Sequence, residues 1–563
     1  MKNILKFSIL AIMLAGGLYA CKDSFLDTPP QAALSNSTLS SSKNGVDATL
    51  IAAYKSLTGW TGNWGASSWG PAPSNWVFNI AADDYHKGSE PGDGDAMLAY
   101  ELYQWNPSDG ENHSKWIATY EGIVRANSAI NTANAYLKSN PGESAYANSI
   151  LGQAIFLRAF YHFEAYKIWK KAPYYLEGDV DFKKPNDKEM LPLIIADLDK
   201  AISLLPANKE AKGRADKTVA TAYLGKAKLY AKDYAGALSA FNTVISSGKY
   251  KLADCFYDNF SVEGDNNSES VFAVQNSVND GDADGFNANF SERLALPHGD
   301  SPYGCCGFKT PSYDLAFAYK VDSKGLPVPT TGVALSKFEA GSKDPVDPRI
   351  DFTIGRTNVP YLDWGIHKDS WVRGQGYMGW YSPKKNGHAK GDAYLSGSWS
   401  GAQLSNLNVE LMRYSDVLLM AAECEVEVGS LENARKYVNM IRTRAGNCGQ
   451  GSSKIAVPIS SPEITWANYK VGTYEEAWNN KDAARQAVRT ERRLELAMEG
   501  HRLFDLQRWG VLETVISEYS KREAKLVSVL SQAKAPTSTN YALPIPSIEI
   551  SKSSGTLKQN SGY

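Results

Sequence analysis

Aromatic side chains in glycine-rich stretches are the residues of this sequence most suited to binding chemistry. An early set is Trp60, Trp64, Trp69 and Trp76, and a later set is Tyr303, Trp364, Trp371 and Trp380. Aromatic residues on helices ordinarily pack in a core, but rings in glycine-rich loops are less easily buried, and exposed rings mark binding sites. A flat indole matches the apolar C–H face of a sugar ring. We therefore predict that these rings contact a ligand, with core packing as the alternative for any single tryptophan.

Charged residues near these rings in the sequence could hydrogen-bond the hydroxyl groups at the rim of a sugar. Asp84 and Lys87 follow the early set, and Arg373 lies within the later one. Carboxylates accept such bonds, whereas ammonium and guanidinium groups donate them. The predicted ligand site therefore includes these three residues.

Asp280, Asp282 and Asp284 alternate with small residues in a turn that could hold calcium. Hard oxygen ligands at alternate positions can converge on one ion, and Gly285 permits a sharp turn. An EF-hand would need a glutamate at the twelfth position of the loop, where this sequence has Ser291. A calcium loop of another kind and a solvated acidic turn both remain open, and no other cofactor is expected.

No segment carries a recognisable catalytic motif. The GxSxG, HExxH and Walker A patterns do not occur. Residues 374–379 fit GxGxxG, but Pro383 follows closely and opposes the helix that a dinucleotide site requires. Glycoside hydrolysis needs two carboxylates roughly 5–10 Å apart, and nothing singles out such a pair among 61 acidic residues. The sequence favours a binding protein over an enzyme, and a surface hydrolase is the less favoured alternative.

The densest charge pattern of the chain runs from Glu491 to Gly510. Glu491, Glu495 and Glu499 recur at every fourth position, so a helix places them on one face, where like charges repel. If that face is buried, each carboxylate needs a basic partner, because an unpaired buried charge is costly. We predict a structural role for this face, with partners drawn from Arg413, Arg442, Arg444 and Arg502.

Helical periodicity recurs in eight segments, which are residues 116–136, 146–170, 189–205, 217–231, 234–247, 410–428, 431–444 and 482–499. Consecutive segments form two helix pairs with the same spacing: 217–231 with 234–247, and 410–428 with 431–444. In each pair, a small residue on the first helix precedes a small residue on the second helix by twelve positions. The pairs are Gly225 with Ala237 and Ala422 with Ala434, and Asp233 and Ser430 can cap the second helices. This spacing resembles the tetratricopeptide repeat, with a generic helical hairpin as the alternative.

Between about residues 250 and 408 the sequence is rich in glycine, proline, asparagine, aspartate and aromatic residues, with short strands such as 270–275. Long loops inside a domain are usually functional. The predicted fold is mostly α, with tetratricopeptide-like helix pairs, a loop-rich insertion and short strands in a single compact domain. This domain is expected to span residues 46–563.

The first twenty residues read as an export signal. Lys2 and Lys6 precede an apolar run that is too short to cross a bilayer as a helix, and Cys21 follows at the cleavage position. Residues 18–21 resemble a lipobox, so we predict that Cys21 is lipidated, with a plain secretory signal as the alternative. Residues 21–45 are expected to form the lipidated N-terminus and a tether, because residues 35–44 are polar and rich in serine.

The charge and the cysteine content of the chain limit which partners and which disulfide bonds can be expected. The formal net charge of −2 gives no electrostatic case for a nucleic-acid partner. Five cysteines remain after Cys21, and an odd, sparse set of this kind does not read as a disulfide framework. The adjacent residues Cys305 and Cys306 could form one disulfide in their glycine-rich loop.

Several segments together resemble the SusD (RagB/SusD) family of outer-membrane lipoproteins of Bacteroidetes. They occur in the family's order and cover nearly the whole chain: residues 21–27, 83–89, 125–127, 157–161, 347–349, 381–385, 413–419, 491–510 and 543–546. The resemblance implies a tetratricopeptide-like scaffold, surface exposure on the outer membrane through a lipid anchor, and no catalysis. It also implies capture of an oligosaccharide or polysaccharide for a SusC-like TonB-dependent transporter.

Two other functions of the same architecture stay open from the sequence. One is a peptide-capture lid, which would carry a cleft lined by polar groups that bind a peptide backbone. The other is a scaffold whose helices only hold the transporter and which has no ligand affinity of its own. The family's ligand residues are poorly fixed in sequence, so the ligand site predicted above depends on the loop aromatics alone.

Overall fold

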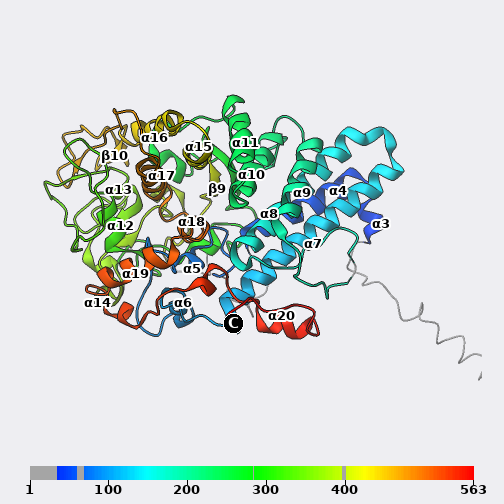
Figure 1. The fold of residues 1–563 in the computed structure, drawn as a ribbon, viewed down its shortest axis with the longest axis horizontal. Helices are drawn as coiled ribbons and strands as arrows, with labels where there is room; N and C mark the ends of the chain where they lie inside the picture. The colour runs from blue at the N-terminus through cyan, green and yellow to red at the C-terminus, as the bar shows by residue number, and fades with distance from the viewer. Residues whose placement is uncertain (1–34, 60–68, 180, 283, 396–400) are drawn as a thin grey trace, which may run out of the picture.

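Long antiparallel helices form one end of the molecule, on the right in Figure 1. The computed structural model describes residues 35–59, 69–179, 181–282, 284–395 and 401–563. The helices of this end are α3 (Asn36–Leu39), α4 (Lys43–Lys55), α7 (Gly110–Ser139), α8 (Ser144–Trp169), α9 (Met190–Leu204), α10 (Lys217–Tyr230) and α11 (Tyr234–Ser246). Each of the helices from α7 to α11 packs on the next, and α11 packs on α15 (Tyr414–Val428). Sequential stacking of this kind is typical of helical repeats.

The two predicted helix pairs are confirmed as α10 with α11 and as α15 with α16 (Leu431–Ala445). A Cβ at Gly225 would lie 2.6 Å from the ring of Phe241, so only glycine allows this close helix crossing. Asp233 and Ser430 accept hydrogen bonds from the main-chain N–H groups of Gly236 and Asn433, at 2.9 and 3.3 Å. Both residues therefore cap the second helices as predicted.

The C-terminal part of the chain first adds helices in the left half of Figure 1, and its last residues then return to the helical end. Its helices are α17 (Lys481–Leu496), α18 (Arg502–Trp509), α19 (Leu512–Glu523) and α20 (Ser547–Lys552). The main-chain N–H of Leu543 donates to the carbonyl oxygen of Ile168 at the end of α8, and Asn112 of α7 donates to the carbonyl oxygen of Pro544. These bonds hold the last residues against the first long helices.

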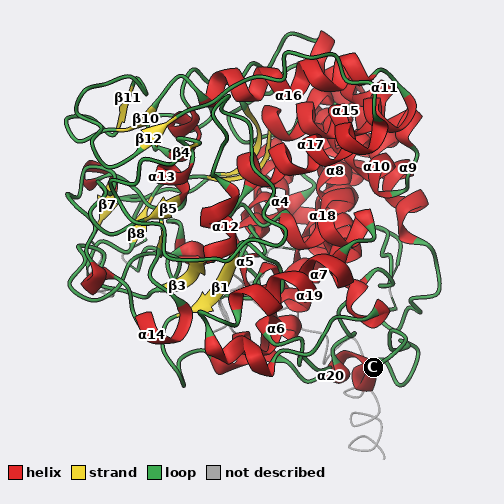
Figure 2. Ribbon diagram, turned by 60° about the vertical axis from the view of Figure 1, so that its left-hand side comes forward, coloured by secondary structure: helices red, strands yellow, loops and turns green. Residues whose placement is uncertain are grey.

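Loops dominate the other end of the molecule, on the left in Figure 2. Its strands form two-stranded pairs: β1 (Tyr85–Gly88) with β3 (Phe308–Pro311), β4 (Pro345–Val346) with β12 (Asn468–Tyr469), β5 (Ile354–Gly355) with β6 (Ser382–Pro383), β7 (Ala393–Tyr394) with β8 (Leu404–Ser405), and β10 (Gly449–Gln450) with β11 (Ala456–Val457). The short helices are α5 (Trp76–Asn79), α6 (Asp95–Glu101), α12 (Tyr313–Ala318), α13 (Ile350–Thr353) and α14 (Gln375–Met378). The predicted loop-rich region with short strands is confirmed.

Single 3₁₀ turns complete the secondary structure. They are η1 (Ser56–Thr58), η2 (Pro141–Glu143), η3 (Phe256–Phe260), η4 (Phe290–Glu292), η5 (Asp369–Trp371), η6 (Lys390–Asp392), η7 (Ser528–Gln532) and η8 (Ser538–Tyr541). Most of them lie in connecting loops. They tighten the loops locally without adding a further layer.

Strands β2 (Ser270–Val274) and β9 (Val409–Arg413) pair antiparallel and tie the two ends of the insertion together. The prediction of a helix over 410–428 is therefore wrong for its first residues, since α15 begins at Tyr414. The apolar residues before Tyr414 fit either period, and only the partner strand, far away in sequence, decides between them. The predicted strand 270–275 is confirmed as β2.

The N-terminal segment is more helical than the sequence predicted. Helix α3 and the first residues of α4 occupy part of the polar stretch 35–44, for which we predicted a tether. Ser35 and Ser42 cap these helices by accepting hydrogen bonds from the main-chain N–H groups of Thr38 and Gly45. Serines that read as tether residues are therefore helix caps here.

Three apolar clusters form the interior of the described part of the chain. The largest runs through all the long helices, and a smaller, mainly aromatic one lies beneath the loops around Phe256, Tyr303 and Tyr361. The smallest contains Phe290 and Leu404. Within the described ranges, the helices are too short or too polar to cross a lipid bilayer.

Candidate binding surface

Glu491 and Glu495 of α17 are buried, and the side chain of Glu499 in the turn after it is only 9 % exposed, as the structural prediction requires. Glu491 pairs with Arg442 at 2.7 Å, Glu495 pairs with Arg413 at 2.9 Å and with Arg444, and Glu499 pairs with Arg413 at 2.8 Å. Three of the four predicted partners are therefore confirmed. The fourth, Arg502, instead pairs with Asp83 at 2.6 Å.

Three members of this buried charge network were not predicted. Arg349 bridges Glu491 and Glu495 at 2.7 and 2.9 Å, and Lys385 lies 2.6 Å from Glu499. Glu269 bonds Arg413 and Arg444 at 2.6 and 2.7 Å. All three come from the loop-rich insertion, so the network joins that insertion to α15, α16 and α17.

These contacts control the ionisation of the carboxyl groups. Burial would raise the pKa of Glu499, but Arg413 and Lys385 outweigh burial and lower it from 4.5 to about 2. Burial acts on Glu495 in the same way, and Arg444, Arg413 and Arg349 together hold its pKa well below the ordinary value. Both side chains are thus stable as anions, which suits ion pairing and not proton transfer.

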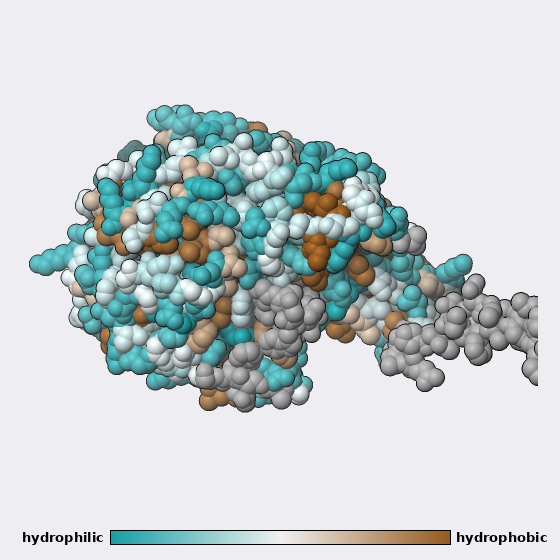
Figure 3. All heavy atoms as spheres, turned by 90° about the horizontal axis from the view of Figure 1, so that it is seen from below, coloured by the Kyte–Doolittle hydropathy of each residue, from teal (hydrophilic) through white to brown (hydrophobic). Residues whose placement is uncertain are grey.

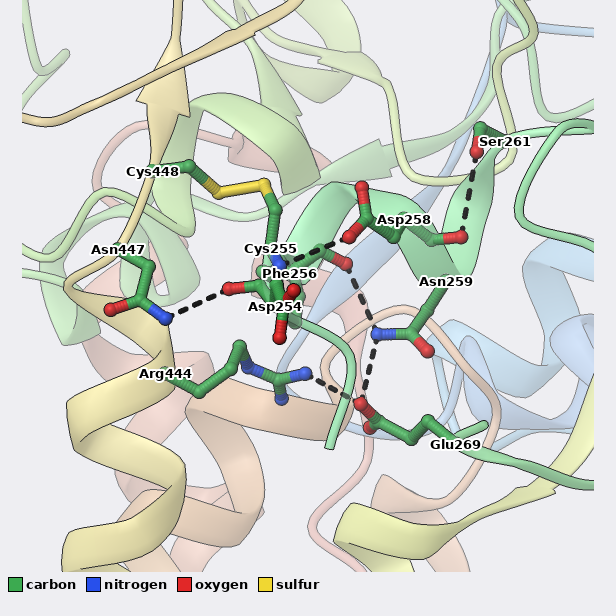
Figure 4. The surroundings of a disulfide bond; sticks show 10 residues. All are labelled: Asp254, Cys255, Phe256, Asp258, Asn259, Ser261, Glu269, Arg444, Asn447 and Cys448. Carbon is green, nitrogen blue, oxygen red and sulfur yellow. Dashed lines mark hydrogen bonds and ion pairs between the residues drawn. A yellow bond between two sulfur atoms is a disulfide. The ribbon is translucent and has the colours of Figure 1, made fainter. Parts of the chain in front are cut away.

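A disulfide between Cys255 and Cys448 lies beside this network (Figure 4). Asn447 donates a hydrogen bond to the carbonyl oxygen of Asp254 at 2.8 Å, next to the disulfide, and Arg444 reaches Glu269 below it. Cys305 and Cys306 form a second disulfide, whereas Cys424 is free and buried. The expectation that the cysteines form no framework is wrong, because pairing across 193 residues leaves no local pattern in the sequence.

The prediction of exposed rings is wrong for Trp76, Trp371 and Tyr303, which are all buried. The indole N–H of Trp76 donates to the carbonyl oxygen of Ser291 at 3.1 Å, and the Tyr303 hydroxyl donates to the carbonyl oxygen of His388 at 2.7 Å. A ring of this size in a glycine-rich loop can turn inward when a buried acceptor satisfies its polar atom. These three rings support the loops from below.

Asp84 and Lys87 are also buried, so the prediction that they meet a ligand is wrong. Asp84 pairs with Arg493 at 3.0 Å. The Lys87 ammonium donates to the main-chain oxygens of Glu90 and Asp93 and lies 5.5 Å from the ring centroid of Phe308. Burial lowers the pKa of Lys87 despite the nearby carboxylates. Charged residues in β1 and directly before it therefore make internal bonds.

Trp69 is partly exposed at one side of the loop region. Its ring stacks on Phe290, with centroids 6.1 Å apart and planes 17° apart, and the Arg293 guanidinium carbon lies 4.6 Å from its centroid. Phe286 and Tyr394 pack around the same cluster with their rings partly exposed. This group presents aromatic surface beside polar side chains.

Trp364 forms a second partly exposed ring. Its indole N–H donates to the carbonyl oxygen of His388 at 2.7 Å, and the Tyr303 ring lies 5.1 Å away beneath it. The Lys390 ammonium lies 5.8 Å from its centroid, and Asp363 accepts a hydrogen bond from the main-chain N–H of Lys390. An exposed acid and an exposed base thus flank this indole.

Two short segments connect these groups. Ala402 donates its main-chain N–H to the carbonyl oxygen of Pro302, and Ser405 accepts one from Asn289, so residues 402–405 run from Tyr303 to Phe290. Residues 388–394 run alongside, because β7 pairs with β8. We call the surface formed by Trp69, Phe286, Trp364 and Tyr394 the aromatic loop face.

The cavity behind this face is small. A hollow of about 10 Å³ lies next to Phe286 and Phe290, which is room for at most one water molecule. A ligand would therefore meet the outer sides of the rings and not enter the protein. Flat contact of this kind suits a sugar ring or chain better than a compact, fully enclosed molecule.

The remaining predicted residues lie elsewhere. Arg373 pairs with Glu90 and, at 2.7 Å, with Asp93, and Trp380 lies under the Lys337 ammonium at 4.6 Å from its centroid. Trp60, Trp64 and Cys21 fall outside the described residues. Their predicted roles in binding and lipidation stay predictions.

The predicted calcium turn uses its carboxylates for its own hydrogen bonds. Asp280 accepts from the Ser277 hydroxyl at 2.5 Å and from the Asn287 amide at 2.9 Å, and Asp282 accepts from the main-chain N–H groups of Asp284 and Asn287. In the described part of the chain, no three His, Cys, Asp or Glu side chains converge in a way that could hold a metal ion. Calcium binding by these three aspartates stays a prediction.

A hollow of about 730 Å³ lies at the helical end, between α3, α7, residues 173–182 and α20. Three large apolar side chains on its walls are strongly exposed, with Val124 at 61 %, Leu176 at 44 % and Phe182 at 66 %. Figure 3 shows apolar surface gathered in a hollowed patch towards this end. Its size and exposed apolar walls make this hollow an alternative binding location, although none of the predicted ligand residues lines it.

Phe286, Tyr394, Asp363 and Lys390 were missed by the sequence analysis. Phe286 stands among glycine and asparagine residues next to the predicted calcium turn, so the criterion that selected the loop tryptophans would also have found it. Asp363 and Lys390 carry no such signal. Only the loop geometry brings them to Trp364.

The fold and the surface define a class of protein in which a helical-repeat scaffold carries a large loop-rich insertion with an aromatic surface. Family models match most of the chain. The SusD family matches residues 268–563, and a family described as starch-binding and associating with the outer membrane matches residues 24–230. The chain belongs to the SusD family, as its sequence motifs indicated.

Individual relatives cover nearly the whole chain. SusD-like protein P25 of Formosa agariphila is 23 % identical over 91 % of this chain and 92 % of its own length. A SusD-like carbohydrate binding protein of Bacteroides fragilis superposes with a TM-score of 0.68 at 20 % identity, over 92 % of this chain and 99 % of that one. Surface glycan-binding protein A of Bacteroides thetaiotaomicron, solved with laminarihexaose, gives 0.65 at 21 % identity, again over 92 % and 99 %. These similarities confirm the predicted fold class.

Proposed function

We propose that this chain is a non-catalytic surface protein that captures an oligosaccharide or polysaccharide on the aromatic loop face. The observation that carries the proposal is the pair of partly exposed indoles, Trp69 and Trp364, held at the two ends of residues 402–405. Each ring can stack on the apolar face of a sugar, and Asp363 and Lys390 can bond the hydroxyl groups at its rim. Membership of the SusD family and the glycan-binding relatives support this assignment.

The same proposal includes the route of the captured glycan. We place the chain on the outer membrane, anchored through a lipid on Cys21, where it passes its ligand to a SusC-like TonB-dependent transporter. The family described as associating with the outer membrane supports this location. The two disulfides also support it, because disulfides persist in oxidising compartments outside the cytoplasm.

The binding step is tested with a glycan array and the fragment of residues 22–563. Alanine at Trp364 or Trp69 should weaken retention on the selected glycan by about tenfold or more, as expected for a tryptophan central to an interface. Trp478→Ala is the matched control, because Trp478 is also partly exposed but packs on Tyr474. Retention that is unchanged in both loop variants would contradict glycan binding on this face.

The anchoring step is tested separately in cells. Cys21→Ala should move the protein from the membrane fraction to a soluble one, while retention of glycan by the purified protein stays unchanged. A transporter that co-purifies with the wild-type protein would support delivery. A variant that stays membrane-bound without Cys21 would contradict the lipid anchor.

A further inference from the structure

A second pocket, which shares no lining residue with the aromatic loop face, is lined by arginines. It has a volume of about 220 Å³ and lies between α12, α17, α18, α19 and residues 328–331, in the left half of Figure 1. The volume is below the roughly 300–1,000 Å³ typical of drug-sized ligands, so it suits a small molecule such as one sugar unit. We call it the Arg489 pocket.

The floor of the Arg489 pocket is electrically balanced. Arg493 pairs with Asp83, Asp84 and Asp314 at 3.2, 3.0 and 2.9 Å. Arg502 pairs with Asp83, and Arg522 pairs with Asp314 at 2.5 Å. Three arginines thus neutralise three aspartates. These pairs fix the shape of the floor and leave no carboxylate there for a further cation.

Arg489 adds a positive charge that this floor does not balance. Its guanidinium carbon lies 4.7 Å from the ring centroid of Trp509, yet among the described residues no carboxylate lies within ion-pair distance of it and its Nε has no acceptor. Its Nε is buried, and burial lowers the pKa of Arg489. The buried Nε of Arg522 also lacks an acceptor in the described structure.

Buried donors without an acceptor are rare in folded proteins, because leaving one unpaired costs free energy. An oxyanion is the ligand that satisfies this set, since carboxylate and sulfate oxygens accept two parallel bonds from a guanidinium. Thr330, Thr331 and Gln486 on the rim offer hydroxyl and amide groups for the rest of a polar ligand. Among the described lining residues, Asp83 and Asp314 are already paired with arginines, and Glu518, exposed at the rim, is the one free carboxylate that opposes an anion.

We propose that the Arg489 pocket binds a small ligand that carries an oxyanion, such as the carboxylate of a sugar acid or a sulfate group. The site is independent of the aromatic loop face, because the two surfaces share no residue. An acidic sugar unit could therefore be recognised by charge here and by stacking there.

Isothermal titration of the 22–563 fragment tests this site with sodium sulfate, sodium D-glucuronate and neutral glucose, each at the same ionic strength set with sodium chloride. The sulfate and glucuronate arms distinguish an inorganic from a sugar-borne oxyanion. We expect binding of at least one anion and none of glucose. Arg489→Gln should weaken anion binding by about tenfold or more, because it removes charge-assisted hydrogen bonds.

Arg485→Gln is the matched control, since Arg485 lies one turn earlier on α17 and pairs with Glu427 and Asp482 outside the pocket. It should leave the affinities for sulfate and glucuronate unchanged. A second measurement on the wild type avoids dependence on the variant. At a low concentration, where the general stabilising effect of sulfate on proteins is small, the anion that binds should raise the melting temperature by mass action, and chloride at the same ionic strength should not. Anion binding that is absent, or equal in Arg489→Gln, would overturn the proposal, as would equal binding of glucose.

Discussion

At the helical end, Gly225 meets the ring of Phe241, whereas in the loop-rich part Glu495 meets three arginines. The first contact joins neighbouring helices by shape, and the residues concerned stand close together in the sequence. The second joins residues from four distant segments by charge. Loops without a regular apolar face cannot be fixed by helix packing, so buried ion pairs and a disulfide fix them here. The binding surface is therefore held by polar contacts that a single substitution can break.

The largest effect is expected for Glu495→Gln. Removal of this carboxylate leaves Arg349, Arg413 and Arg444 with an uncompensated buried charge, which costs about 3–5 kcal/mol of unfolding free energy. Urea unfolding measures this loss. Glu432→Gln, which breaks an exposed pair with Arg435, should cause no measurable change. Equal stability of the two variants would show that the network does not hold the loops.

Replacement of Cys255 and Cys448 by serine should cost about 2–4 kcal/mol, because the disulfide restrains a very long loop in the unfolded chain. The control replaces Cys305 and Cys306, which are neighbours and enclose no loop, so its loss should be much smaller. Thermal unfolding of both double variants in the absence of reductant gives the comparison. A larger loss in the control would contradict the tethering role.

Gly225→Ala should destabilise the helical end by about 1–3 kcal/mol, because the new methyl group would clash with Phe241. Replacement of glycine by alanine usually stabilises the interior of a helix. Gly110→Ala, at the start of α7 with open space around it, should therefore be neutral or stabilising by up to about 1 kcal/mol. Chemical denaturation distinguishes the two, and a stabilised Gly225→Ala protein would refute the close helix crossing.

The smallest effect on the free energy of unfolding is expected when the pH is lowered from 5 to 4. The folded-state pKa of Glu499 is about 2, below its ordinary value of 4.5, so its contribution to stability is present above pH 4.5 and is lost as the pH falls towards 2. Between pH 5 and 4 this amounts to less than about 1 kcal/mol. Urea midpoints at the two pH values should differ more for the wild type than for Glu499→Gln. An equal difference would indicate that other groups account for the acid sensitivity.

What the sequence predicted follows the same division. The α10–α11 and α15–α16 pairs and three arginine partners were predictable because periodicity and spacing are local signals. Arg349, Lys385 and the Cys255–Cys448 disulfide were not, since each depends on loops meeting across more than a hundred residues. The prediction of which tryptophan rings are exposed failed for the same reason. Trp76 and Trp364 both stand in segments predicted as loops, and only the fold turns Trp76 inward and leaves Trp364 partly exposed.

Hydrogen exchange with and without the glycan selected by the array tests most directly where the ligand binds. We expect slower exchange in residues 284–306, 363–373 and 388–394, which together with Trp69 carry the aromatic loop face, and no change in α7 or residues 173–182. Protection confined to α7 and residues 173–182, around the apolar hollow of the helical end, would contradict it.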